Sequence, residues 1–272
     1  MQEAVHSSTE TTDVAIIGAG NVATHLGKAI AASGTRIVGV WSPHTEHARA
    51  LAANLDCPAF VSLEQLPQAS LCIISVKDDA LPDVARQVGY LYSKNANSII
   101  AHTAGSMPID ILTSFHKRAA VIYPLQTLSR FRPVNFREVS LFIEGSTEQV
   151  VSSVKTFCSK LSDHVETATS LQRKRIHLAA VFACNFPNHC YAIAQQLLRE
   201  SGLDERCIIP LVEETAHKLR TLPAAEAQTG PAVRRDTKVI AAQSEQLASH
   251  PLWQSIYKAM SQSIHDFQPS KD

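Results

Sequence analysis

The sequence has no net charge, because its 25 lysines and arginines are balanced by 25 aspartates and glutamates. It also lacks any block of like charges, which argues against a nucleic acid or an anionic membrane as a partner held by bulk electrostatics. None of its apolar runs approaches the ~20 residues that cross a bilayer. These absences favour a small-molecule partner, and we expect no nucleic-acid and no membrane binding.

Paired cysteines are missing as well. The six cysteines are scattered without a C-x-x-C pair, and Cys72 and Cys184 lie within apolar stretches. This usage is typical of reduced, buried thiols in a cytoplasmic protein and predicts no metal site. Residues 1–12 are polar and lack the basic and apolar regions of a signal peptide, so we expect a disordered tail and a cytoplasmic location.

The pattern that is present begins at Asp13, where short β-branched runs without alternating polarity are interleaved with helical patterns. Such runs are typical of buried parallel strands. They predict a doubly wound α/β sheet of the Rossmann type, whose ligands lie beyond the carboxyl ends of the strands. The expected strands cover 14–17, 36–41, 71–76, 98–101, 119–123 and 140–144, and the first two helices cover 22–32 and 46–54.

The strand pattern stops near residue 168. Only helical patterns follow, over 170–201, 205–222, 232–249 and 252–267. At 272 residues with 45% hydrophobic content, the chain is long enough for two domains. We therefore predict a Rossmann domain over 13–168 and an all-helical domain over 169–272.

A glycine-rich turn at residues 18–23, GAGNVA, follows the first strand and opens a helix, which is the context that the GxGxx[GA] fingerprint requires. The first glycine permits the tight turn, the second lets backbone approach a pyrophosphate, and Ala23 leaves room for packing of the helix on the strand. The helix N-terminus favours phosphate oxygens. A glycine turn in an unliganded domain is the alternative. The predicted cofactor-binding residues of this turn are Gly18, Ala19, Gly20, Asn21 and Val22.

The end of the second strand indicates which dinucleotide would bind. An NAD site would have an Asp or Glu there for the ribose hydroxyls, whereas this strand ends VWSPH. The missing carboxylate removes repulsion against a 2′-phosphate, which Ser42 and His44, or less readily Arg49, could contact. We therefore predict NADP rather than NAD, with ordinary loop polarity and helix capping as the other interpretation of Ser42 and His44.

Several further motifs carry a family resemblance. Val76-Lys77 and the HTAG turn at 102–105 follow strands where pyrroline-5-carboxylate reductases have a VKP-like and an AG-bearing turn. More closely, HTAGS, YPLQT at 123–127 and TGPAVRRD at 229–236 resemble a family of two-domain bacterial Rossmann-like NADP oxidoreductases. The resemblance implies a cofactor domain followed by a helical domain that dimerises and helps close the active site. It also implies that Val76, Lys77 and Thr103 border the cofactor.

One departure from the reductases limits the resemblance. Residues 185–188 read NFPN where the reductases have a small-residue GSGPAY-like stretch, so we do not expect proline synthesis.

His102 is the first candidate catalytic residue, because it stands at the carboxyl end of a predicted parallel strand. A histidine can give a proton to a carbonyl or imine as hydride arrives, or orient the substrate. Alternatively, His102 and Thr103 hydrogen-bond their own loop, with Ser106 capping the next helix and Pro108 in its first turn.

Other candidates lie further along the chain. Gln126 and Thr127 also follow a strand and could contact substrate. On the long helix, steps of about 100° align His177 with Asn188, flanked by Asn185, and Pro187 predicts a kink. We expect Asn185 and His177 to polarise a substrate and Arg234 to hold its negative charge, although a buried helix contact and a structural pair with Asp236 are equally simple explanations.

Together these features predict an NADP(H)-dependent oxidoreductase that transfers hydride to or from a small carbonyl, imine or alcohol, as a homodimer through the helical domain. A non-catalytic NADP sensor or interaction protein is the alternative from another class. Hydride exchange with a deazaflavin would change only the partner molecule.

Overall fold

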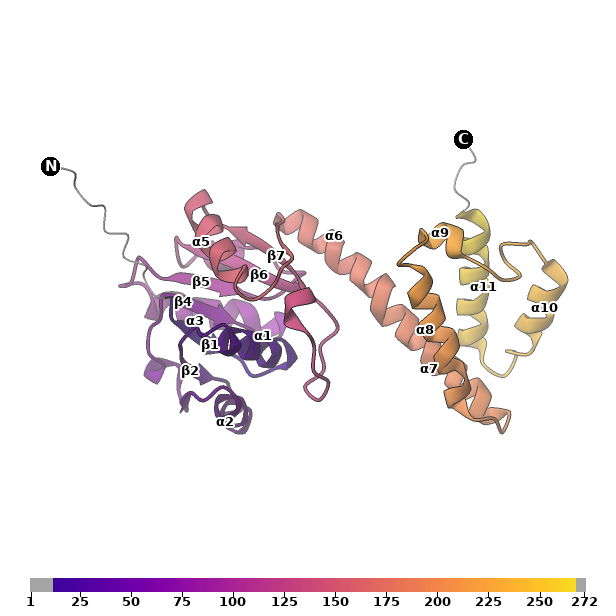
Figure 1. Cartoon of the computed structure of the whole chain (residues 1–272), viewed down its shortest axis with the longest axis horizontal. Coiled ribbons are helices and arrows are strands. Elements are labelled where there is room, and N and C mark those ends of the chain that lie inside the picture. Colours follow the sequence, from indigo (N-terminus) through magenta and orange to yellow (C-terminus); the bar gives the residue numbers. More distant parts are fainter. Residues whose placement is uncertain (1–11, 268–272) are drawn as a thin grey trace. The chain divides into compact units, whose positions relative to one another are not determined.

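The computed structural model describes residues 12–267, so the predicted tail lies outside it except for Thr12. Contacts group the chain into two units, unit 1 up to Cys184 and unit 2 from Asn185 (Figure 1). The helix expected over 170–201 is thus divided, with residues 170–184 grouped with the first unit and the rest with the second. The boundary from contacts lies later than the predicted one at 168.

Unit 1 is built on one eight-stranded sheet of order β3-β2-β1-β4-β5-β6-β7-β8. Within the described residues all neighbouring pairs are parallel except β6 and β7. The predicted doubly wound Rossmann sheet is confirmed. The strands are β1 (Val14–Ile17), β2 (Ile37–Trp41), β3 (Ala59–Phe60), β4 (Leu71–Ile74), β5 (Ile99–His102), β6 (Ala119–Leu125), β7 (Ser140–Gly145) and β8 (Val165–Thr167).

Two expectations about the strands were wrong. β7 was expected to be parallel, but it runs antiparallel to β6, because the connection between them holds only the short 3₁₀ turn Phe136–Glu138 instead of a crossover helix. β3 and β8 were missed, since two and three residues are too few to show a periodicity.

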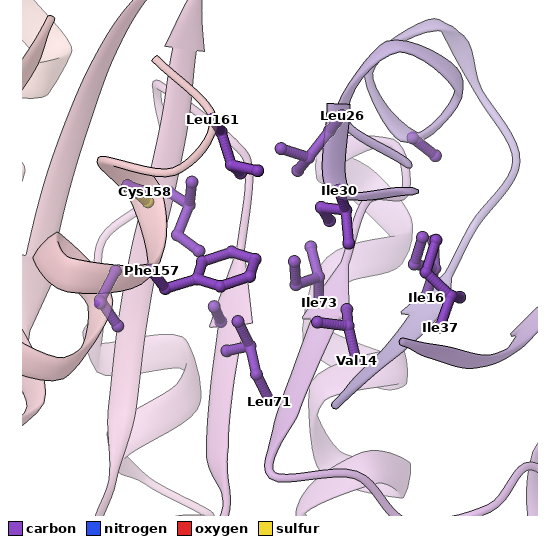
Figure 2. Packing of buried hydrophobic residues seen from close by; sticks show 14 of the residues in the cluster. Val14, Ile16, Leu26, Ile30, Ile37, Leu71, Ile73, Phe157, Cys158 and Leu161 are labelled. Carbon is purple, nitrogen blue, oxygen red and sulfur yellow. The ribbon is translucent and has the colours of Figure 1, made fainter. Parts of the chain in front are cut away.

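Both faces of the sheet are buried, as the continuous apolar runs require. Val14 and Ile16 pack with Leu26, Ile30 and Phe157 on one face (Figure 2). Ala15 and Ile17, the alternate residues of the same strand, pack on the opposite face. The helices of unit 1 are α1 (Asn21–Ala32), α2 (Thr45–Asn54), α3 (Leu81–Leu91), α4 (Asp110–Thr113), α5 (Glu148–Cys158) and α6 (Ser170–Ala180).

Unit 2 is all helical over its described residues, 185–267, which confirms the second half of the predicted fold. The helix expected over 232–249 begins later, at Thr237, because Arg235 has a φ of 56° and the Asp236 carboxylate caps the new helix by accepting from the Val239 N–H. The helices are α7 (Phe186–Glu200), α8 (Ile209–Lys218), α9 (Ala224–Ala227), α10 (Thr237–Glu245) and α11 (Pro251–Asp266).

The described helices include none with both the length and the apolar character that a bilayer crossing demands.

Candidate active site

The turn after β1 can be formed only by glycine. Gly18 has a φ of +105°, and a Cβ built on it would lie 2.1 Å from the carbonyl oxygen of Ser75 at the end of β4. On the other side, the Gly18 N–H donates to the Trp41 carbonyl at the end of β2, 2.7 Å away. The turn is therefore clamped between the two neighbouring strands, which fixes the direction in which α1 departs.

The start of α1 offers unused hydrogen-bond donors. Gly20 is its N-cap residue, no side chain caps it, and its first turn holds no acidic residue. No atom lies within 4 Å of the position of a Cβ on Gly20, so the backbone there is open to a close approach. Ala23 is buried, as the packing of helix on strand requires. These features fit the pyrophosphate of a dinucleotide, which needs free N–H groups and close backbone approach.

The end of β2 presents Ser42 and His44. Ser42 is buried, and its hydroxyl accepts from the His44 N–H at 3.4 Å. His44 is exposed at the start of α2, with its ring centroid 5.2 Å from that of His47. Arg49 is paired with Glu46 at 3.5 Å on the solvent side. His44 is better placed than Arg49 to contact a 2′-phosphate, because Arg49 already has an acidic partner.

Ser75 and Val76, at the end of β4, connect the glycine turn with Thr103. The Thr103 hydroxyl donates to the Ser75 hydroxyl at 3.1 Å, which ties the ends of β4 and β5 together. The Val76 side chain would be 3.3 Å from a Cβ on Gly18. Lys77 is exposed at the start of the following 3₁₀ turn. Val76 therefore lies beside Gly18, Thr103 is linked to the same place through Ser75, and the Lys77 side chain faces solvent.

His102 is fully buried at the end of β5, and both its ring nitrogens serve its own loop. Nδ1 accepts from the Ala104 N–H at 3.2 Å, and Nε2 lies 3.3 Å from the Pro108 carbonyl, to which it donates in the matching tautomer. Burial, followed by the nearby Arg173 guanidinium, lowers the pKa of His102 to about 4. The imidazole is therefore neutral near pH 7, a state that suits an orienting group better than a proton donor.

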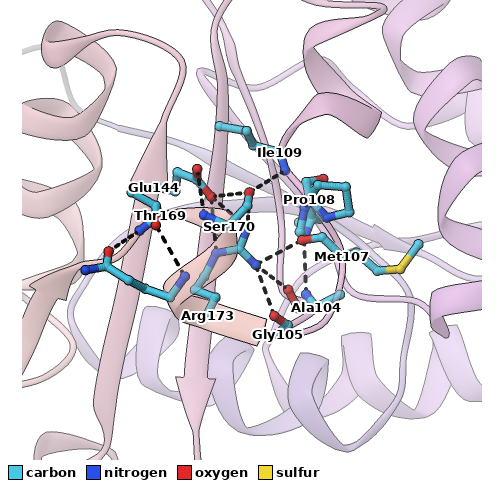
Figure 3. A network of polar contacts seen from close by, with 11 residues as sticks. Ala104, Gly105, Met107, Pro108, Ile109, Glu144, Thr169, Ser170 and Arg173 are labelled. Atoms are coloured by element: carbon cyan, nitrogen blue, oxygen red, sulfur yellow. Dashed lines mark hydrogen bonds and ion pairs between the residues drawn. The ribbon is translucent and has the colours of Figure 1, made fainter. Parts of the chain in front are cut away.

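Arg173, at the start of α6, is a site residue that the sequence did not reveal (Figure 3). Its guanidinium is fully buried, pairs with Glu144 of β7 at 2.7 Å, and donates to the carbonyls of Ala104, Gly105 and Met107. Arg173, which is far along the chain, therefore stabilises the turn that follows β5 through these hydrogen bonds. No sequence signal marked it, because Arg173 stands in a run of polar residues, QRKR.

His177 lies one turn further along α6. The Tyr123 hydroxyl, from the end of β6, is 3.2 Å from His177 Nδ1. A Cβ on Gly105 would fall 2.6 Å from the Tyr123 ring, so the glycine lets that ring lie against the turn after β5. The sequence indicated His177 but not Tyr123 as its partner. A titratable pair therefore stands beside the turn that His102 organises.

The structure gives less support to the other predicted site residues. Asn185 and Arg234 belong to unit 2, where both are exposed, and their place in a site stays a prediction. The expected alignment of His177 with Asn188 assumed uniform 100° steps, but Val181–Asn185 is π-helical and turns less per residue. The Gln126 side chain accepts from the N–H of its neighbour Thr127.

The comparisons with known proteins agree with this geometry. Residues 3–127 match the Rossmann-like domain family, and residues 139–264 match the DUF2520 domain. A crystal structure of a "putative NADP oxidoreductase" from Bacteroides fragilis is 41% identical, with a TM-score of 0.88 over 94% of this chain and 98% of that one. The chain belongs to this family of two-domain Rossmann-like and DUF2520 proteins.

More distant members of the fold show the same plan. A Thermotoga maritima protein is 21% identical with a TM-score of 0.70, over 93% of this chain and 97% of that one. A pyrroline-5-carboxylate reductase from Coxiella burnetii is 16% identical with a TM-score of 0.57, over 96% of this chain and 100% of that one. A search of curated protein sequences finds no match. The predicted resemblance to both groups is confirmed at the level of the fold.

Proposed function

We propose that this chain is an NADP(H)-dependent oxidoreductase acting on a small carbonyl, imine or alcohol. The observation that carries the proposal is the Gly18 turn, where backbone packs so closely on Ser75 that no side chain fits, next to an open, uncapped helix start at Gly20. Family membership with the Bacteroides fragilis protein supports the cofactor class, and reductive aminase and reductase neighbours share the fold.

Each group of residues would hold one part of the cofactor. The backbone of residues 18–22 would bind the pyrophosphate, Ser42 and His44 the 2′-phosphate, and Val76, Lys77 and Thr103 would border the remainder. When bound, the nicotinamide supplies the hydride. The protein's own contribution is to position the reactants and to move a proton.

For the proton we favour His177 over His102. The Tyr123 hydroxyl can donate to His177 Nδ1, and this bond would keep the proton of a neutral imidazole on Nε2. His102 would then orient the turn that faces the substrate. On a confirmed substrate, His177→Asn should lower kcat at least tenfold, whereas an unchanged kcat would remove His177 from the mechanism.

Calorimetric titration of cofactor-stripped protein with NADPH and NADH tests the proposal directly. We expect micromolar NADPH binding at least tenfold tighter than NADH binding, a difference of about 1.4 kcal/mol. Gly20→Asp should abolish it by placing a carboxylate at the phosphate position. Ala31→Asp is the matched control, because it adds the same charge at an exposed position near the other end of α1. No binding of either nucleotide to the wild type would refute the proposal.

One observation favours the alternative of a non-catalytic sensor. His102, the proton donor that the sequence suggested first, is buried and neutral, and both its ring nitrogens are hydrogen-bonded within its own loop. The absorbance of NADPH, followed with a panel of oxo acids, imines and aldehydes, separates the two functions. An enzyme consumes NADPH with some member of the panel, whereas a sensor binds NADPH and changes only its state of assembly.

We further propose that the protein is a cytoplasmic homodimer, formed through unit 2. Among the described residues of unit 2, only Ala232, Ser244 and Leu247 are buried. Several large apolar side chains are at least half exposed there, and such surfaces mark interaction sites: Leu203, Leu211, Leu219, Leu252 and Met260. Light scattering should give twice the chain mass, and a single-chain mass at micromolar concentration would refute the dimer.

A further inference from the structure

The segment that joins β6 to the 3₁₀ turn Phe136–Glu138, residues 126–135, lies against the glycine turn. The Arg130 guanidinium donates to the carbonyl of Ala19, the residue between the two glycines of the fingerprint. Beside it, His25 of α1 is 2.8 Å from the Ser129 carbonyl through Nε2, and its ring is buried. We call residues 126–135 the strap. Two hydrogen bonds therefore hold the strap, one to the turn between β1 and α1 at Ala19 and one to α1 itself at His25.

The strap adds positive charge where the fingerprint has none. Residues 18–24 contain no charged side chain, whereas the strap carries Arg130 and Arg132 and no carboxylate. The strap also lines part of a cavity of about 470 Å³, and the lining of this cavity includes cationic side chains but no carboxylate. Its cationic lining is Lys28, Arg130, Arg137 and Lys160, of which Arg137 is paired with Asp163. An anion at the glycine turn would thus meet a positive potential from the strap.

We propose that Arg130 is a ligand of the dinucleotide pyrophosphate, delivered by the strap to the phosphate-binding turn. This proposal rests on the proposed function, because it concerns the same site. A guanidinium has five N–H donors in a planar fork. The bond to the Ala19 carbonyl uses part of that fork and fixes its position, and Arg130 is exposed, so the remaining donors are available to phosphate oxygens.

The contact with Ala19 selects the pyrophosphate over the 2′-phosphate. Ala19 belongs to the turn that would cradle the pyrophosphate, whereas the 2′-phosphate would lie at the end of β2, beside Ser42 and His44. The pyrophosphate is common to NADPH and NADH. Arg130 must therefore contribute equally to both affinities.

Arg130→Gln tests this assignment. Arg132→Gln is the matched control, since it removes the same charge from an exposed position of the same strap, while the hydrogen bond to the turn comes from Arg130. We expect Arg130→Gln to raise the Kd of both NADPH and NADH by the same factor, about tenfold or more, as for a lost charge-assisted hydrogen bond. Arg132→Gln should change either Kd less than threefold. Arg130→Lys keeps the charge without the fork and should fall between the two.

The possible outcomes separate the two proposals. A loss of affinity for NADPH alone would assign Arg130 to the 2′-phosphate and overturn the inference, as would equal Kd values for Arg130→Gln and the wild type. A wild type that binds neither nucleotide would overturn the proposed function itself, and this inference with it. A lower dependence of log Kd on salt in Arg130→Gln than in Arg132→Gln would support the direct phosphate contact.

Discussion

The guanidinium of Arg173 and the carboxylate of Glu144 form an ion pair at 2.7 Å in which Arg173 is fully buried and Glu144 is 17% exposed. A buried charge is tolerated only when its hydrogen bonds are satisfied. Arg173 meets that condition with the carboxylate, the Ser170 hydroxyl and three carbonyls of the turn after β5. The pair therefore stabilises the conformation of residues 104–107 and the contact between α6 and β7.

Replacing Arg173 by Met should destabilise the fold by about 3–5 kcal/mol. The change removes the cation paired with Glu144, which keeps only its two Ser170 donors, and leaves three carbonyls without the guanidinium donor. Urea unfolding measures this loss. Arg175→Met, at an exposed position of the same helix, should change the free energy of unfolding by less than about 0.5 kcal/mol. Equal values for the two variants would show that the network contributes nothing to stability.

Gly18→Ala and Gly34→Ala separate two costs at glycines with positive φ. Both residues are in the left-handed region, at +105° and +76°, but only Gly18 has a close neighbour, the Ser75 carbonyl. Gly34→Ala should cost about 1–2 kcal/mol from backbone strain alone. Gly18→Ala should cost clearly more and weaken NADPH binding, as measured by thermal unfolding and calorimetry. A similar Tm for both variants would mean that the turn relaxes.

The pKa of His102 predicts a dependence of stability on pH. Burial lowers this pKa to about 4 from 6.5, so the unfolded chain binds a proton at a pH where the folded chain does not. The contribution of His102 is complete above pH 6.5 and is lost as pH falls from 6.5 to 4, by at most about 1.4 kcal/mol per pH unit.

Urea unfolding of His102→Gln at several pH values provides the check. The variant should be less stable near pH 7 and should lose less stability than the wild type between pH 6.5 and 4. His44→Gln, which alters an exposed histidine, should follow the wild type. If His102→Gln keeps the full pH dependence, the titration belongs to other groups.

Ser42→Asp should remove the preference for NADPH over NADH. A carboxylate at the end of β2 would repel a 2′-phosphate and accept from ribose hydroxyls, as in NAD sites. We expect the ratio of the NADH Kd to the NADPH Kd to fall at least tenfold by calorimetry. Glu64→Asp, at an exposed position of the 3₁₀ turn Leu63–Gln65, is a control that should leave the ratio unchanged. An unaltered ratio in Ser42→Asp would place the 2′-phosphate elsewhere.

The sequence predicted the features that depend on neighbouring residues. Val14–Ile17 and the turn at Gly18 follow from an apolar run and a fingerprint, and the structure has both. It could not predict the direction of β7, which depends on the absence of a crossover helix, or the two short edge strands.

The same limit applies to the site. His102 could be located at a strand end from local pattern, but its role depends on burial and on the charge of Arg173, which the fold brings near it. Arg173 reaches Ala104 across 69 positions of the chain, and Tyr123 reaches His177 across 54. No periodicity encodes such distant pairs, so one sequence without its fold cannot reveal them.

The Arg173 contacts also bear on how this chain can be cut and recombined. A fragment ending at residue 168 would contain every strand of the sheet, and yet the turn after β5 would lack the donor for three of its carbonyls. A chimera that exchanges the helical half must therefore carry the first turn of α6 with the Rossmann half. The unit that evolution or an engineer can exchange therefore ends after Arg173, later in the chain than the last strand of the sheet.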